Sequence, residues 1–551
     1  MPPLRVLLVV LLGLACVSPV ATVATAADDA ELHTILSALA SDDAAVRKAA
    51  LVRLGASRDA RLIPFLDDYS QGSAYRLVDR VVVAPIASDG ADGTKVAILL
   101  DPLSRQPLGA EAVPLGELTV LEAGRRERVA ARDATNRLRL YVPDRDARLS
   151  AVTRVGDGED AGAAGVLADV LAVESDPAVR RAAAEGVHLL RLLDTDPEHA
   201  ALRSASISAL ADLGSARSLP KLRAVLDTKP DAETAAVASA AIARIESWQS
   251  TLRAVGHVFS GLSLGSVLIL ISLGLAIIFG LMGVINMAHG ELVMIGAYAT
   301  FLTQKAFELW LPAAWSPAYF LVAIPIAFAA AAMVGWIIEQ AVVRWLYGRP
   351  LETLLATYGV SLILSQLVRS IFGDNRAVNS PAWLQGGIEV ANGLVLPYAR
   401  LFILGFCAAA VIGLVLLIGR TRIGLLLRAT TQNRPMAAAL GVGTRRIDGF
   451  AFALGSGIAG MAGCALTLIS NITPNMGQEL VVDSFLVVVV GGVGKLVGVV
   501  IAGLGLGSLT KLFEPWTQAV WAKVLVLMTV IVFIQWRPSG FFPQKGRLSD
   551  A

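Results

Sequence analysis

Three polar side chains stand close together within the mostly apolar stretch "GLMGVINMAHGELVMIGAY", namely Asn286, His289 and Glu291. Polar groups at the depth of a membrane are costly unless they face a bundle interior or a cavity, and there they line the path of a solute. A water-exposed turn between two helices would explain the same residues, so both interpretations stand. A proton relay is disfavoured, because no third acid or base is placed to extend it.

A second candidate feature is the glycine-rich stretch "VVVVGGVGKLVG", which contains Gly491, Gly492 and Gly494. It is not a phosphate-binding P-loop, because it lacks the GxxxxGK[ST] spacing and the Ser or Thr that would hold Mg²⁺. The sequence therefore predicts that this chain binds no ATP and no other cofactor. It also lacks grouped His, Cys or paired carboxylates, so we expect no catalytic residue and no metal site.

A third feature is the basic segment "NRPMAAALGVGTRR", which carries arginines at both ends and no acid. Asn433 is a good helix cap, Pro435 suits a first helical turn, and Gly441 can end the helix. The small side chains between them would permit close contact with another protein. The sequence therefore predicts a short docking helix, and a purely structural loop is the alternative.

The elements that must position these residues are mainly helices of membrane-spanning length. Of the 551 residues, 55% are apolar and 17% are charged, and the formal net charge of +2 gives no reason to expect nucleic-acid binding. Charged residues are frequent up to about residue 250, and long apolar runs follow. We expect crossing segments near 260–281, 287–304, 318–339, 354–371, 401–419, 447–470, 484–493, 496–511 and 520–536.

The two segments beside the glycine-rich stretch are too short to cross the membrane regularly. They are predicted to form a broken pair whose turn is shielded from lipid, since unsatisfied backbone groups facing lipid are costly. Counting the pair as one crossing gives eight transmembrane segments, and counting it as two gives nine.

The orientation follows from Arg and Lys in the short loops, which mark the cytoplasmic side. With an exported N-terminal half, nine crossings place the C-terminus in the cytoplasm, in agreement with its basic tail. The residues that mark this side are Arg344 and Arg349; Arg420, Arg422, Arg428, Arg434, Arg445 and Arg446; and Arg537, Lys545 and Arg547.

The first half of the chain is predicted to be exported. Residues 1–26 have the basic start, apolar run and small residues of a cleavable signal peptide, and an uncleaved anchor is the alternative. Residues 27–250 would then be a periplasmic domain. "SDDAAVRKAALVRLG" and "SDPAVRRAAAEGV" share an acidic helix cap and a basic, alanine-rich core, and they resemble HEAT-like helical repeats. Short β-branched runs, among them "RLRLYVP", predict a small β insertion at about residues 75–153.

Three stretches of the second half resemble, in the same order, the membrane permease of branched-chain amino acid ABC importers. They are "NMAHGELVMIGAY", "GLLLRATTQNRPMAAALGVGTRRIDGFAFALGSGIAGMAG" and "VVVVGGVGKLVGVVIAGLGLG". The resemblance covers about residues 256–545. The predicted fold is an α-helical polytopic membrane protein, a bundle of eight or nine transmembrane segments with broken helices, preceded by the exported domain.

The resemblance implies a place in the bacterial inner membrane and several partners. These are a second permease subunit, two ATPase subunits that hold ATP and Mg²⁺, and a periplasmic substrate-binding protein. It also implies that the cytoplasmic loop 420–446 carries a coupling helix that rests on the ATPase. The residues at the matching positions are Arg428, Asn433, Met436, Ala439, Leu440 and Gly441.

The exported extension is similar to that of the urea ABC permeases, a branch of the same family. It implies urea as the substrate, a small neutral solute that suits a path lined by hydrogen-bonding groups. Branched-chain amino acids or short amides are the alternative substrates. A membrane-anchored sensor or scaffold is a further alternative, although an anchor would need no coupling-like loop.

Overall fold

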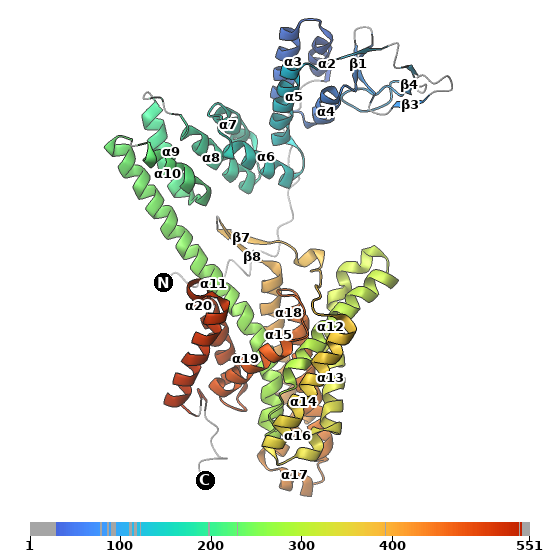
Figure 1. Cartoon of the computed structure of the whole chain (residues 1–551), viewed down its shortest axis with the longest axis vertical. Helices are drawn as coiled ribbons and strands as arrows, with labels where there is room; N and C mark the ends of the chain where they lie inside the picture. The colour runs from blue at the N-terminus through green and yellow to red at the C-terminus, as the bar shows by residue number, and fades with distance from the viewer. Residues whose placement is uncertain are drawn as a thin grey trace. The chain divides into compact units, whose positions relative to one another are not determined.

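The computed structural model describes residues 29–542, apart from gaps at 78–79, 85–86, 90–94, 110–112, 115–117, 122, 195, 197–198, 229, 392 and 539. The predicted signal peptide and the last basic residues of the tail lie outside the described residues. The chain divides into two compact units, Met1–Ser247 and Trp248–Ala551, called here the N-terminal unit and the C-terminal unit. In Figure 1 they run from blue to green and from green to red.

The N-terminal unit consists mainly of short helices, several of which begin at a capping aspartate. The side chain of Asp43 accepts a hydrogen bond from the backbone N of Ala45 at 2.8 Å, and Asp176 accepts one from Ala178 at 2.9 Å. These are the acidic caps predicted from the sequence. The resemblance to HEAT repeats stays a prediction. The helices are α2 (Asp29–Ser37), α3 (Ala44–Ala56), α4 (Ile63–Gln71), α5 (Arg125–Leu138), α6 (Arg145–Asp157), α7 (Ala163–Val173), α8 (Pro177–Arg191), α9 (Ala200–Leu213) and α10 (Leu219–Asp227).

Between α4 and α5 lie two small antiparallel sheets, each of three described strands, in the orders β2–β1–β6 and β3–β4–β5. In the first sheet Ala74 pairs with Val83 and Tyr75 with Val120. The strands are β1 (Ala74–Leu77), β2 (Arg80–Val83), β3 (Ala87–Asp89), β4 (Lys95–Ala97), β5 (Val113–Pro114) and β6 (Thr119–Val120).

The last part of the predicted β insertion is wrong. "RLRLYVP" forms the end of α5 and a 3₁₀ turn at Arg139–Tyr141, and helices continue beyond residue 153. Ala131, Ala134 and Leu138 are buried at helical spacing. Their shared apolar face packs on the core, and this packing outweighs the local alternation of apolar and polar residues.

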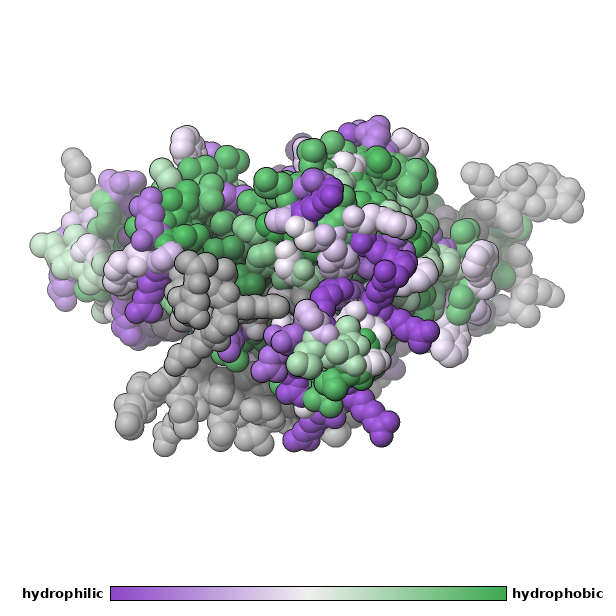
Figure 2. Space-filling view, turned by 90° about the horizontal axis from the view of Figure 1, so that it is seen from below, coloured by the Kyte–Doolittle hydropathy of each residue, from purple (hydrophilic) through white to green (hydrophobic). Residues whose placement is uncertain are grey.

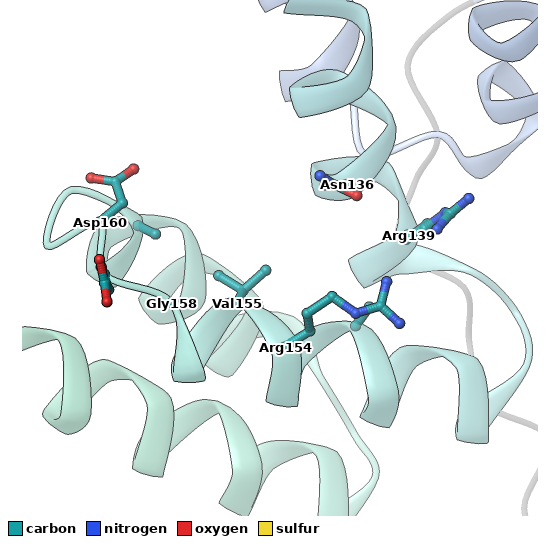
Figure 3. A pocket seen from close by; sticks show the side chains of 9 residues that line it. Asn136, Arg139, Arg154, Val155, Gly158 and Asp160 are labelled. Atoms are coloured by element: carbon teal, nitrogen blue, oxygen red, sulfur yellow. The ribbon is translucent and has the colours of Figure 1, made fainter. Parts of the chain in front are cut away.

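One open pocket of the N-terminal unit, with a volume of about 240 Å³, lies beside the end of α5 and the start of α7. Figure 3 shows Arg139 and Arg154 among its lining residues, with Asn136 above them. The lining also contains Glu159 and Asp160. Because both signs of charge are present, no single ligand charge is favoured there.

The C-terminal unit is a helical bundle with a small hairpin. The hairpin pairs β7 (Gly387–Ala391) with β8 (Leu394–Pro397), and α11 begins in the N-terminal unit. The helices are α11 (Ala232–Met282), α12 (His289–Trp310), α13 (Tyr319–Ala341), α14 (Pro350–Phe372), α15 (Tyr398–Arg420), α16 (Arg422–Gln432), α17 (Arg434–Ala439), α18 (Thr444–Leu466), α19 (Met476–Gly491) and α20 (Leu496–Trp536).

Six of the described helices are long and apolar enough to cross a membrane: α11, α13, α14, α15, α18 and α20. Helix α12 has 22 residues but no apolar window long enough to be counted with these six, and α19 has only 16 residues. Helix α20, with 41 residues, would extend about 60 Å, twice the thickness of a hydrocarbon core. Its backbone is broken at Gln518 (φ 64°), between the predicted segments 496–511 and 520–536. The count of eight or nine crossings stays a prediction.

Glycine residues allow α12 and α18 to pack in direct backbone contact, and α13 covers the same helices (Figure 1). A Cβ atom at Gly296 would collide with the carbonyl oxygen of Gly460. A Cβ atom at Gly463 would likewise collide with the carbonyl oxygen of Val293. Such close approach requires the small residues that the sequence concentrates in "LGSGIAGMAG".

Candidate functional site

The polar residues Asn286, His289 and Glu291 surround the start of α12, and all three are buried. The side-chain oxygen of Asn286 accepts a hydrogen bond from the backbone N of Ala288 at 3.0 Å, which fixes the turn before the helix. His289 Nε2 donates to the backbone oxygen of Ile271 in α11 at 2.9 Å. Their burial does not fit a water-exposed turn, and the cluster instead lies inside the bundle.

Helix α14 presents a row of hydroxyl groups to this cluster. Ser361 Oγ donates to Glu291 Oε1 at 2.9 Å, and the backbone N of Met287 donates to Thr357 Oγ1 at 3.1 Å. The sequence analysis missed this row, although its regular interval of four residues is visible in the sequence. Residues four apart lie on one helix face. The row consists of Thr353, Thr357, Ser361 and Ser365, all of them buried.

Three buried polar atoms of the cluster have no hydrogen-bond partner among the described residues: Asn286 Nδ2, His289 Nδ1 and Glu291 Oε2. Most buried polar groups in proteins are paired. The group thus contains one hydrogen-bond donor and two acceptors, all near the start of α12. That these residues line a solute path stays a prediction.

The second candidate site is the loop between α15 and α18, which folds into α16 and the short helix α17. The side chain of Asn433 accepts a hydrogen bond from the backbone N of Met436 at 3.0 Å, as a helix cap does. Gly441 has a φ of 85° and ends the helix. The short capped helix predicted from the sequence is therefore present.

Apolar side chains project from the exposed side of α17. Met436 is 57% exposed and Leu440 is 78% exposed, and they lie four residues apart, next to the exposed Ala439. Arg428 is also exposed, on α16. Figure 1 shows α17 at the lower end of the C-terminal unit, and Figure 2 shows that face with hydrophilic patches beside apolar ones. Exposed apolar side chains on a short helix are free to contact another protein.

Helix α17 is fixed to the bundle through Arg434. Its guanidinium group forms a two-pronged ion pair with the buried carboxylate of Asp448 in α18, with NH1 3.3 Å from Oδ1. It also lies 4.8 Å from the centre of the Tyr347 ring. Burial raises the pKa of Tyr347, so its hydroxyl group stays protonated. A displacement of α17 would therefore pull directly on α18.

We expect Asp448→Asn to lower the melting temperature of the purified chain by about 5 °C, because it leaves Arg434 without its counter-charge. Loss of one partner of a buried pair costs several kcal/mol, and we expect about 2 kcal/mol because Arg434 is partly exposed. Thermal unfolding in detergent measures the change. Glu352→Gln is the matched control, since its pair with Arg349 is exposed, and it should shift the midpoint by less than about 1 °C. Equal shifts for both variants would contradict the proposed anchor.

The glycine-rich stretch forms a tight turn between α19 and α20. Gly492 and Gly494 have φ angles of 94° and 79°, which favour glycine. A Cβ atom at Gly491 would lie 2.6 Å from the backbone of Gly498, so the two helices meet closely at this end. The turn matches the predicted broken pair, although α19 begins at Met476, eight residues before the predicted segment.

The long apolar helices define the class of polytopic membrane proteins. Residues 257–535 match the family described as the permease component of the branched-chain amino acid transport system. The chain belongs to this family. Membership implies that it works with an ATPase and other subunits.

Similar proteins include permeases from several bacteria. The chain is 31% identical over 298 residues to the high-affinity branched-chain amino acid transport system permease protein LivH of Salmonella typhimurium, and equally so to LivH of Escherichia coli. The match covers 52% of this chain and 94% of LivH. It is 28% identical to BraD of Pseudomonas aeruginosa, over 51% of this chain and 93% of BraD. No solved structure matches the chain.

Proposed function

We propose that this chain is the permease subunit of an ATP-driven urea importer in the bacterial inner membrane. The observation that carries the transport function is the exposed apolar side of α17, on Met436 and Leu440, joined to the bundle through Arg434 and Asp448. An ATPase subunit that binds this side would pull on α18 when it changes shape. The movement would open a path beside the polar cluster first to one side of the membrane and then to the other.

The chain itself is proposed to be neither an enzyme nor a nucleotide-binding protein. ATP and Mg²⁺ would bind two ATPase subunits, a second permease subunit would complete the path, and a periplasmic binding protein would deliver the solute. Loop 420–446 and the C-terminus would lie in the cytoplasm, and the N-terminal unit in the periplasm. The arginines of the loop support this orientation.

Two substrates have support from different observations. Urea is favoured because the long N-terminal unit resembles the extension of urea ABC permeases. Only 6% of LivH lies outside the match, which is too short for a counterpart of this unit. The amide of Asn286 and the hydroxyl groups along α14 are neutral hydrogen-bonding groups and also suit urea. Branched-chain amino acids are the second candidate, because the relatives are described as permeases for them.

Uptake of labelled solutes by a deletion strain tests the choice. At micromolar urea we expect uptake to fall at least about tenfold in the deletion strain and to return with the intact chain, because passive entry is slow at this concentration. Excess leucine should leave urea uptake unchanged, and acetamide should compete weakly. Undiminished urea uptake together with lost leucine uptake would identify branched-chain amino acids, and not urea, as the substrate. Unchanged uptake of both solutes would contradict the importer proposal.

A further inference from the structure

A basic pocket opens between α13 and α18, on the same side of the bundle as the coupling loop. Its volume is about 510 Å³. Three arginines contribute to it: Arg344 follows α13, while Arg445 and Arg446 belong to the first turn of α18. The other lining residues are Trp336, Gln340, Gly449, Phe450 and Ala453. No carboxylate is part of the lining.

The positive charge of this pocket is only partly balanced. The nearest acids in the sequence, Glu339 and Asp448, are both buried. Asp448 is paired with Arg434, and Glu339 accepts a hydrogen bond from Gln340 at 2.7 Å. Within the part of the chain that the structure describes, Arg445 and Arg446 form no ion pair. Even if Glu339 offsets one arginine of the lining, two positive charges remain.

Apolar surface continues from the pocket along α13. Trp336 is 50% exposed and Phe450 is 37% exposed, so an aromatic ring from each helix borders the arginines. Met333 and Ile337 are also exposed on α13, which is apolar enough to cross a membrane. A ligand that fits both the arginines of the pocket and the apolar surface of α13 needs an anionic head and a long apolar tail. A free anion would make no use of the apolar surface.

We propose that this pocket binds the headgroup of an anionic phospholipid, with its phosphate among the three arginines and its acyl chains along α13. Guanidinium groups bind phosphate oxygens in pairs of parallel hydrogen bonds. Basic pockets between transmembrane helices on the cytoplasmic side suit such headgroups. The inference depends on the membrane orientation proposed above and does not depend on which solute is carried.

Because the pocket lies beside Asp448, a bound lipid would stabilise the α13–α18 contact next to the anchor of α17. Arg344 Nη1 donates to Gln340 Oε1 at 2.9 Å, which holds one arginine toward α13. The lipid would bridge it to Arg445 and Arg446 on α18. The proposed effect is local to this pair of helices.

The test titrates the delipidated, full-length importer complex with phosphatidylglycerol in a neutral detergent and counts retained lipid by native mass spectrometry. We expect Arg445→Gln combined with Arg446→Gln to weaken retention about thirtyfold, roughly fivefold for each lost charge. Arg445→Lys with Arg446→Lys should keep most of the binding. Arg420→Gln with Arg422→Gln removes the same charge outside the pocket and should leave retention unchanged.

Three results would overturn the proposal. Equal retention of phosphatidylcholine would show that the headgroup charge has no role. Displacement of the lipid by inorganic phosphate at the same concentration would identify a site for a free anion. Loss of the ATPase subunits from the Gln double variant, with lipid retention unchanged, would assign the arginines to a protein contact. Size-exclusion profiles show whether each variant remains folded, and the Lys double variant tests the charge if the Gln variant does not fold.

Discussion

Leu440→Asp is expected to abolish uptake and to reduce recovery of the ATPase subunit with the chain at least about tenfold. Leu440 is 78% exposed at the end of α17 and forms an apolar surface with Met436. A partner that buries this surface would have to bury a carboxylate instead, and an unpaired buried charge costs several kcal/mol. Affinity purification of the complex and uptake in the same strain measure both effects.

The matched control for this variant is Leu351→Asp. Leu351 is 82% exposed in the first turn of α14 and follows Arg349, so it lies on the side that the arginines mark as cytoplasmic. An acidic residue there interacts favourably with the helix dipole and should leave the complex intact. Ala439→Arg, next to Leu440, should behave like Leu440→Asp. Normal recovery of the ATPase subunit with both α17 variants would contradict the coupling assignment.

Gly296→Leu is expected to reduce the amount of folded chain in the membrane to less than about a tenth of the wild-type level. Its side chain would meet the backbone of Gly460 in α18, and backbone cannot move aside without separating the helices. Separation would also disturb α13, which packs on both helices. Fluorescence-detected size-exclusion chromatography of a fusion protein measures the folded amount.

Gly405→Leu in α15 is the matched control, because a Cβ atom at Gly405 would meet nothing within 4 Å. Leucine also has a higher helix propensity than glycine, so this variant should fold at least as well as the wild type. Gly296→Ala should have an intermediate effect, since even one Cβ atom collides. Normal folding of Gly296→Leu would show that the α12–α18 contact is looser than the structure has it.

The short helix α17 was predictable because its signals are local. Asn433 caps the helix and Gly441 ends it, only a few residues apart, and both features are present in the structure. Six of the predicted apolar segments, those in α11, α13, α14, α15, α18 and α20, were predictable for the same reason, since apolar length depends only on consecutive residues. The strand prediction for "RLRLYVP" was wrong, because burial of α5 on its core outweighed a local pattern.

The sequence by itself determined the membrane-spanning class, the basic loop and its caps, and the presence of polar residues near the start of α12. Only the tertiary structure decided what those residues contact. Glu291 meets Ser361, 70 residues away, and Arg434 meets Asp448 beside Tyr347. The basic pocket likewise joins the end of α13 to the start of α18. Such contacts depend on how separate helices pack. Packing brings together residues that are far apart in the sequence, and no local sequence pattern indicates which of them will meet.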